Sequence, residues 1–330
     1  MSRAPLRRDR VAASAVAATL ALVLGACSGD VIGDFPSPPS PAITDSPTPE
    51  VEEGILAEIA VDGSPCDVAE AAGRVWVTAF DGDELIEIDP ATNDVVDIHR
   101  MPGGPCGMTA DDGILWIETQ NAGSLVLFDP ERREVSGRLR VRGGVVGTIS
   151  TPWGLWAAAG QAEQILRIDP EARRIVARIN VEGPLGGLAF EEDQIWTVAG
   201  RSELVRIDPR SNRIVERIPL ESYEPEGLAI DRTTLWVSSS FEGEVLRVDR
   251  RTGRVRDRLP VADSLFGGIV VGADYWVAGS DGTVYHLDGR TGEVVDRFEL
   301  VGFGPVPAAG NLWTVDFVAS TVFRLDEPAG

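Results

Sequence analysis

The sequence contains no lysine and few of the residues that usually carry catalysis. Its 30 basic residues are all Arg, against 52 Asp and Glu, and the net charge is −22. A surface this acidic repels phosphate backbones, which argues against nucleic-acid binding, although the charge also keeps a domain soluble. The two His and three Cys form no metal-spaced cluster. With no Ser-His-Asp set, phosphate-binding loop or nucleophile elbow, we predict no catalytic residue, no metal and no cofactor.

A long hydrophobic run is also missing. The run from Val11 to Leu24 is too short for a comfortable membrane span, and it follows four Arg residues within the first ten positions. This combination is typical of a targeting segment, which we assign to residues 1–27 and exclude from the fold.

The targeting segment ends in Leu24-Gly25-Ala26-Cys27, which resembles the lipobox of bacterial lipoproteins. The resemblance implies that Cys27 is diacylated, becomes the mature N-terminus and anchors the protein to the membrane outside the cytoplasm. The alternative is an ordinary secretory signal with an incidental Cys. The missing Lys and the bias toward Arg, Ala, Gly and Val indicate a GC-rich genome and fit an actinobacterial lipoprotein. The Arg7-Arg8 pair leaves open whether export is by the Sec or the twin-arginine route.

Residues 28–50 are rich in Pro, Ser, Thr and Asp and cannot build a core. We expect them to form an extended tether, which at roughly 3.1 Å per residue would hold the following domain some 70 Å from the lipid.

A unit of about forty residues recurs throughout residues 51–330. Three columns keep this period, and together they are the signature of a repeat architecture. The first column is Trp76, Trp116, Trp156, Trp196, Trp236, Trp276 and Trp313. The second is Asp89, Asp129, Asp169, Asp208, Asp249, Asp288 and Asp326. The third, nine residues before the Trp, is Gly107, Gly147, Gly187, Gly227, Gly267 and Gly304.

Each unit contains four short runs of β-branched and apolar residues bounded by Gly, Pro, Asn or Asp, the pattern of four strands joined by tight turns. A four-stranded repeat of this length is the blade of a β-propeller, so the sequence predicts an all-β, seven-bladed propeller. The segment 55–61 matches a fourth strand, whereas the chain stops after a third. We therefore expect strand 55–61 to complete the last blade, because an unpaired edge would invite aggregation.

The recurring residues have structural interpretations. We expect the Trp side chains to lie in the core between neighbouring blades. The recurring Asp caps the turn between the third and fourth strands, and the residue four positions later occupies a left-handed backbone position. Asn93, Asn212, Gly253 and Gly292 suit that position, and Arg133 and Arg173 suit it less well. Trp153, in a turn on the opposite face from the channel mouth, is interpreted either as an exposed contact or as packed under its own turn.

Segments such as Pro225 to Asp231, Leu235 to Val237 and Val245 to Asp249 resemble the repeats of virginiamycin B (streptogramin) lyases and of YVTN-repeat surface propellers. Both families are seven-bladed, and the resemblance covers residues 51–330. The lyase resemblance implies a magnesium site and a general-base His near the channel. His99 and His286 lie within expected strands and not in loops at the channel mouth, so the sequence argues against the lyase activity.

A binding site, if the propeller has one, is expected where the loops entering the first strands and the loops between second and third strands share one face around the channel. Its acids, aromatics and Arg suit a polar or cationic ligand or an envelope protein, and the alternative is an ordinary polar rim. The candidate binding residues are Asp67, Gln120, Asn121, Arg201, Tyr223, Glu226, Phe241, Phe266, Asp281, Phe303 and Asp316.

Cys66 and Cys106 occupy the same column of adjacent blades, each after a Pro and before a first strand. Equivalent points on neighbouring innermost strands approach each other, and an extracytoplasmic compartment is oxidising, so we predict a disulfide between them. Two free thiols, or a metal site with further ligands, are the alternatives.

These observations favour a lipid-anchored, non-catalytic binding module at the cell envelope. A streptogramin-lyase-like or other metal-assisted enzyme, and a structural spacer, remain the alternatives.

Overall fold

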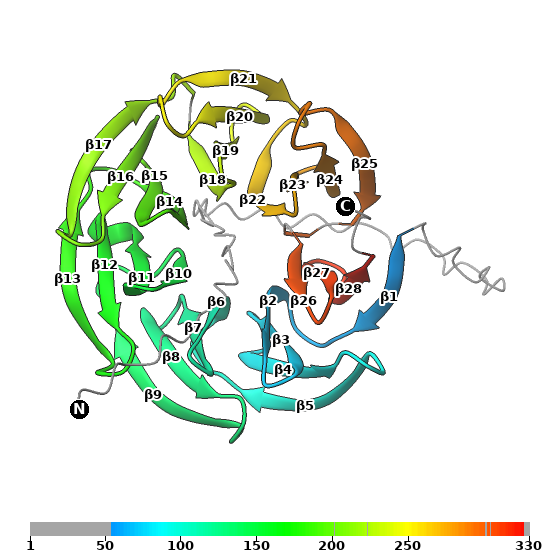
Figure 1. Cartoon of the computed structure of the whole chain (residues 1–330). Helices are drawn as coiled ribbons and strands as arrows, with labels where there is room; N and C mark the ends of the chain where they lie inside the picture. The colour runs from blue at the N-terminus through cyan, green and yellow to red at the C-terminus, as the bar shows by residue number, and fades with distance from the viewer. Residues whose placement is uncertain (1–53, 201, 223, 301, 304, 327–330) are drawn as a thin grey trace, which may run out of the picture.

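The computed structural model describes residues 54–326 except 201, 223, 301 and 304, and here the chain forms seven four-stranded antiparallel sheets around a central axis (Figure 1). The predicted seven-bladed β-propeller is therefore confirmed. The predicted targeting segment with Cys27 and the predicted tether 28–50 lie outside the described residues, as do Arg201 and Tyr223.

Blades 1 to 4 each take four consecutive strands, counted from the channel outward. Blade 1 has β2 (Pro65–Ala71), β3 (Arg74–Ala79), β4 (Glu84–Asp89) and β5 (Asp94–Arg100). Blade 2 has β6 (Pro105–Asp111), β7 (Ile114–Thr119), β8 (Ser124–Asp129) and β9 (Glu134–Arg140). Blade 3 has β10 (Thr148–Thr151), β11 (Gly154–Ala159), β12 (Gln164–Asp169) and β13 (Arg174–Asn180), with the short 3-10 helix η1 (Gly160–Ala162). Blade 4 has β14 (Leu185–Glu191), β15 (Gln194–Ala199), β16 (Glu203–Asp208) and β17 (Arg213–Pro219).

Blades 5 and 6 follow the same plan, and blade 7 combines both ends of the described chain. Blade 5 has β18 (Pro225–Ile230), β19 (Thr234–Ser239), β20 (Glu244–Asp249) and β21 (Val255–Pro260). Blade 6 has β22 (Leu265–Val271), β23 (Asp274–Gly279), β24 (Thr283–Leu287) and β25 (Val294–Glu299). Blade 7 has β26 (Val306–Ala308), β27 (Asn311–Asp316), β28 (Thr321–Leu325) and, outermost, β1 (Ile55–Ala60).

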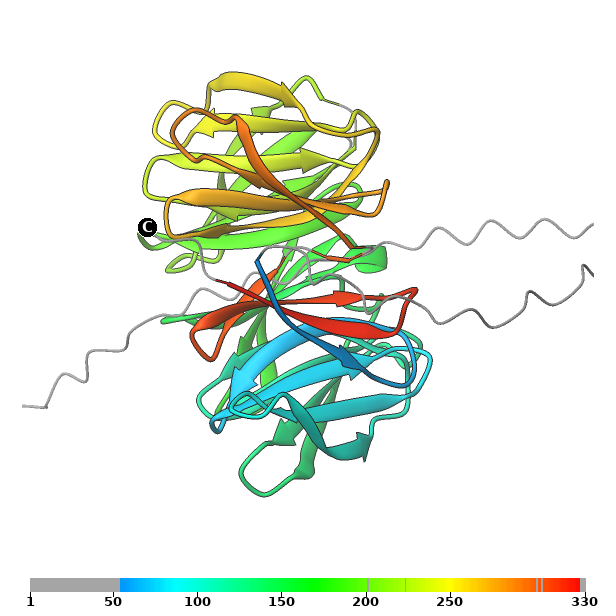
Figure 2. The ribbon, with the colours of Figure 1, turned by 90° about the vertical axis from the view of Figure 1, so that its right-hand side faces the viewer.

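The N-terminal strand closes the ring as the sequence predicts. β1 pairs antiparallel with β28 from Ile55 opposite Leu325 to Ala60 opposite Thr321, and it runs beside the C-terminal strands in both views (Figures 1 and 2). Ile55 and Ile59 are buried in this blade. The first and last strands of the propeller therefore hold each other in place.

The seven repeat Trp side chains are at most 1% exposed, and each packs against the blade that follows its own. Trp76 of blade 1 lies among Leu115 and Ile117 of blade 2, and Trp313 of blade 7 lies among Val75 and other residues of blade 1. The hydrophobic core is thus a series of inter-blade layers, which confirms the predicted role of the Trp column.

The Gly column lies where innermost strands of neighbouring blades approach closely. A Cβ on Gly227 would lie 2.2 Å from the carbonyl oxygen of Gly267, and one on Gly187 would lie 2.9 Å from the nitrogen of Leu228. No side chain fits at such distances, so this column permits the strands to converge on the channel.

The recurring Asp caps six turns, as predicted. Asp129, for example, accepts hydrogen bonds from the backbone nitrogens of Glu131 and Arg132, and the carboxylates of Asp89, Asp169, Asp208, Asp249 and Asp288 accept equivalent bonds. The pKa of Asp129 lies below its usual value mainly because of the bond from Arg132. The residue four positions later is left-handed in these turns, including Arg133 (φ 56°) and Arg173 (φ 52°).

The predicted disulfide is present. It joins Cys66 on β2 to Cys106 on β6, which are 40 positions apart in sequence, with 5.0 Å between the two Cα atoms. In the chain-entropy model, a disulfide that closes a loop of this length stabilises the folded state by about 4 kcal/mol. The bond connects the innermost strands of blades 1 and 2.

Among the described residues, no helix has the length and apolar character needed to cross a membrane.

Candidate functional site

The channel-mouth face is built from two sets of loops that are hydrogen-bonded to each other. The backbone nitrogen of Phe80, in the β3–β4 loop, donates to the carbonyl of Ser64, in the loop entering β2 (2.8 Å). Equivalent bonds join Gln120 to Gly104, Gln161 to Gly143, Ser240 to Glu224 and Ser280 to Ser264. These paired loops give five blades the same rigid rim on one face.

The candidate residues differ in how they lie on this rim. Asn121, Asp281 and Phe241 are exposed, and Phe241 presents 67% of its surface. The half-buried members are Gln120, Glu226, Phe266 and Phe303. Asp67 and Asp316 are buried. The described members therefore divide into a solvent-facing group and a group in the wall of the ring.

Two rim acids also have structural tasks. Asp281 accepts hydrogen bonds from the backbone nitrogen of Thr283 and from the hydroxyl of Tyr285. Asp316 accepts bonds from the backbone nitrogens of Val318 and Ala319. These carboxylates hold the β23–β24 and β27–β28 loops in shape, which fixes the orientation of neighbouring rim residues.

Asp67 does not face the mouth but is directed into the wall between blades 1 and 2. Its carboxylate accepts hydrogen bonds from the backbone nitrogens of Val68 (2.8 Å) and Met108 (2.7 Å). Burial raises its pKa to about 8, against the lowering effect of those two bonds. At neutral pH this carboxyl is therefore largely protonated.

A second buried acid, Glu118 on β7, faces the same region and was not identified from the sequence. It accepts a hydrogen bond from the hydroxyl of Thr148 on β10 (3.0 Å), and burial raises its pKa to about 7. Its charge adds to the rise in the pKa of Asp67. The carboxylate fills the space beside Gly107, where a Cβ would lie 2.6 Å from it. Asp67 and Glu118 thus form a buried acid pair next to the disulfide.

Both acids could have been noticed as departures from their columns. Asp67 stands nine residues before Trp76, where the following copies have Gly. Glu118 stands two residues after Trp116, where all six other copies have Ala, Val, Ser or Thr. An acidic residue in a column of small residues indicates a carboxyl group that is buried and hydrogen-bonded within the protein.

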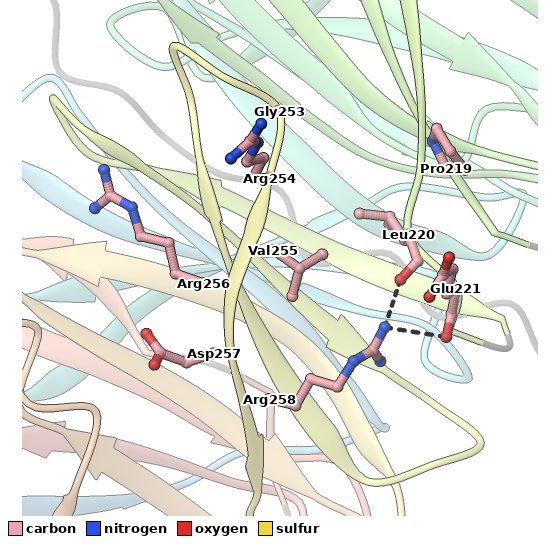
Figure 3. Close-up of a pocket in the computed structure, with 9 residues that line it drawn as sticks. All are labelled: Pro219, Leu220, Glu221, Gly253, Arg254, Val255, Arg256, Asp257 and Arg258. Carbon is pink, nitrogen blue, oxygen red and sulfur yellow. Dashed lines mark hydrogen bonds between the residues drawn. The ribbon is translucent and has the colours of Figure 1, made fainter.

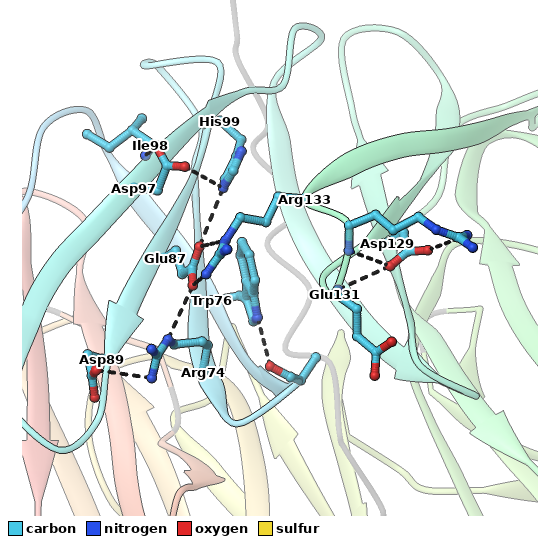
Figure 4. Close-up of polar contacts among 12 residues, drawn as sticks. Arg74, Trp76, Glu87, Asp89, Asp97, Ile98, His99, Asp129, Glu131 and Arg133 are labelled. Carbon is cyan, nitrogen blue, oxygen red and sulfur yellow. Dashed lines mark hydrogen bonds and ion pairs between the residues drawn. The ribbon is translucent and has the colours of Figure 1, made fainter.

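A third group of titratable residues, on the outer strands of blade 1, has the composition of a metal site. Ligand atoms of Glu87, Asp97 and His99 lie within 4.8 Å of one another. However, Arg133 from the next blade donates two hydrogen bonds to Glu87, at 2.7 and 2.8 Å, and Arg74 lies 3.3 Å away (Figure 4). The bonds from Arg133 hold the pKa of Glu87 below its usual value.

Two guanidinium groups already neutralise Glu87, so a cation at this point would be repelled. The cluster is better explained as a join between blades 1 and 2. In blades 3, 5 and 7 an Arg occupies the position of Glu87 and donates to the following blade's turn, as Arg167 does to Pro209 and Asn212. Blade 1 reverses the charges, because Glu87 accepts from Arg133 in the turn of blade 2.

Neither His lies at the channel mouth. His99 is on β5, with its ring 5.6 Å from that of Trp76 and 5.1 Å from that of Phe128. His286 is on β24, stacked on Trp276 at 4.2 Å and hydrogen-bonded to Asp274 at 2.9 Å. Both rings serve as packing groups, which agrees with the sequence interpretation.

The side chain of Trp153 packs against neighbouring residues and does not extend into solvent. Its indole nitrogen donates to Asp193 of the next blade (3.1 Å), and the guanidinium carbons of Arg167 and Arg210 lie 5.9 and 5.4 Å from its ring centroid. Trp153 is half-buried and joins blades 3 and 4. The side chain therefore packs, but against the next blade and not only under its own turn as predicted.

The architecture and the site together define a seven-bladed β-propeller whose rim combines acids and aromatics. No family model matches the chain, and no curated protein matches its sequence. Among solved structures the chain is similar to a streptogramin B lyase, with a TM-score of 0.68 and 13% identity over 82% of this chain and 96% of that one. It is equally similar to a chain of Kuenenia stuttgartiensis hydrazine synthase, with a TM-score of 0.68 and 16% identity over 82% and 98%. At these identities the similarity shows the fold alone.

Proposed function

We propose that the protein is a lipid-anchored, extracytoplasmic and non-catalytic binding module. Its channel-mouth face binds an envelope protein or a small polar or cationic ligand. The observation that carries the proposal is the rim itself. Phe241 is 67% exposed and Val318 is 76% exposed, and they share the face with the exposed carboxylate of Asp281. Exposed aromatic groups are enriched at recognition surfaces, and charged groups at the rim attract a partner of opposite charge.

The electrostatics favour a cationic partner. The net charge of −22 gives the whole molecule a negative field, which raises the local concentration of cations around it. Neither His lies near the mouth as a general base, because His99 is on the outer strand β5 and His286 is buried on β24, stacked on Trp276 of its own blade. The similarity to streptogramin B lyase supports the propeller scaffold alone.

Affinity capture from envelope extracts of the native host tests the binding role. The propeller should retain a specific partner or ligand, and the double variant Glu226→Ala, Phe266→Ala should lose it, because these residues lie on neighbouring inner strands at the mouth. Val215→Ala is the matched control, since Val215 is 49% exposed on the outer strand β17. Equal retention by the wild type and the double variant would count against the channel-mouth face.

Anchoring has its own test. Replacing Cys27 by Ala removes the sulfur atom to which, according to the lipobox resemblance, the lipid is attached. The protein should therefore move from the membrane pellet to the soluble fraction. Fractionation of the native host by ultracentrifugation, followed by immunodetection, measures this shift. Retention of the Cys27→Ala variant in the pellet would show that the lipobox interpretation is wrong.

A further inference from the structure

A small apolar groove lies where the ring closes, between β1 of blade 7 and β5 of blade 1. It encloses about 250 Å³ and is lined by Ala60, Val61, Asp62, Ile86, Val95 and Ile98. Val95 is 37% exposed and Ile98 is 45% exposed. Apolar side chains therefore face solvent at the outer edge of a strongly charged molecule.

The equivalent groove between blades 4 and 5 has a different character (Figure 3). Ile98 stands opposite Ile86 in blade 1, and Arg258 stands opposite Leu246 in blade 5, so the two residues occupy the same position. Arg258 donates hydrogen bonds across its groove to the carbonyls of Leu220 (2.6 Å) and Glu221 (3.1 Å). A guanidinium thus bridges this groove.

Ile98 is the exception in this column. Strand register places an Arg at the corresponding point of the outer strand in blades 2 to 6, namely Arg138, Arg178, Arg217, Arg258 and Arg297. Blade 7 has Glu58 there. Only the blade 1 groove presents an apolar side chain at this point. Other outer strands also expose single apolar residues, such as Val135 and Val215, but Val95 and Ile98 line a groove, and exposed apolar surface that lines a groove is the kind that marks a docking site.

We propose that this groove binds the chain's own segment Val31–Phe35. Within residues 28–50, which are dominated by Pro, Ser, Thr and Asp, Val31, Ile32 and Phe35 form an apolar group. The 19 residues from Phe35 to Gly54 can span at most about 65 Å. The groove lies one length of β1 from Ile55, and that six-residue strand covers about 20 Å. The segment therefore reaches the groove easily.

The size of the groove favours a tethered segment over a second copy of the chain. A stable interface between two proteins buries about 800 Å² on each partner, which is more than a groove lined by six residues offers. A segment attached to the same chain has a millimolar effective concentration, so a small contact suffices. Because Phe35 follows Cys27 by only eight residues, docking would hold the ring-closure edge of an anchored propeller near the lipid.

A photo-crosslinking experiment on the whole chain tests the proposal independently of any ligand at the channel mouth. With p-benzoylphenylalanine in place of Phe35, irradiation should give intramolecular cross-links that mass spectrometry maps to Ala60–Val61 or Val95–Ile98. Adding Ile98→Arg should reduce this product at least tenfold, with the melting temperature unchanged, because five other blades carry Arg at that position.

Two controls keep the outcome decisive. Val31→Asp lies outside the described blades, so it tests the contact without altering the groove, and it should also reduce the product at least tenfold. The same photoreactive residue in place of Ser46 measures mere proximity. The proposal is overturned if position 46 labels the groove as strongly as position 35, if the cross-links join two chains, or if neither Ile98→Arg nor Val31→Asp reduces the yield.

Discussion

Deleting residues 51–61 is expected to destabilise the propeller by more than any single substitution would. The deletion removes β1, the outer strand of blade 7, whose backbone pairs with β28 over its whole length. It also removes Ile55 and Ile59, which are 8% and 7% exposed. Removing a buried Ile side chain costs about 2–5 kcal/mol, and the two losses together approach the whole stability of an ordinary domain. The remaining edge of β28 would be free to pair with other chains.

Thermal unfolding and size-exclusion chromatography measure the two effects of this deletion. We expect a much lower melting temperature and soluble aggregates for the chain lacking 51–61. A chain lacking residues 28–48 is the matched control, because it loses more residues but no strand of a blade, and its melting temperature should change by a few degrees at most. Equal melting temperatures for the two deletions would refute closure of the ring by β1.

The architecture could be predicted because its determinants recur in the sequence. Each column repeats at a fixed period, and a single physical reason explains all members of a column. The Trp column fills the space between blades, and the Asp column caps turns, so an observation on one blade applies to the others. Strand 55–61 was recognisable for the same reason, since it matches the fourth strand of the repeat.

The contacts between unlike residues of different blades could not be predicted in this way. Glu87 and Arg133 are 46 positions apart, and each departs from its own column. The sequence does not show that the two departures compensate, because the register between neighbouring blades is set by packing. The same holds for Asp67, whose position near a first strand suggested the mouth. Its side chain instead turns to the backbone nitrogen of Met108 on β6.

The stability of the propeller is expected to fall between about pH 5 and pH 8.5 because of the buried acid pair. Burial raises the pKa of Asp67 from 3.8 to about 8 and that of Glu118 from 4.5 to about 7. Between these limits the folded protein binds more protons than the unfolded chain. The stabilisation that comes from the raised values is therefore fully present at low pH and is lost as the pH rises through the folded pKa values. Each pKa unit corresponds to about 1.4 kcal/mol, so the loss is on the order of 5 kcal/mol.

Carboxylates with lowered pKa values act in the opposite direction, but in a lower pH range. The pKa values of Asp129, Asp208 and Asp288 lie below the usual value mainly because of hydrogen bonds in their turns, so their contribution disappears only as the pH falls below about 4. Stability should therefore be greatest near pH 4–5. The decline in stability toward pH 8.5 can therefore be attributed to the buried acid pair and not to these surface acids.

Urea unfolding at pH 5 and at pH 8.5 measures this decline, and the variant Asp67→Asn, Glu118→Gln should remove most of it. Neither amide titrates, so the free energy of unfolding of the double variant should be nearly constant over this range. The two oxygens of Asp67 each accept one backbone hydrogen bond, and an amide at this position has a single oxygen to offer, so the variant loses stability at pH 5 as well. The diagnostic quantity is thus the slope with pH and not the absolute stability. An unchanged slope in the double variant would show that these two carboxyls remain ionised inside the folded ring.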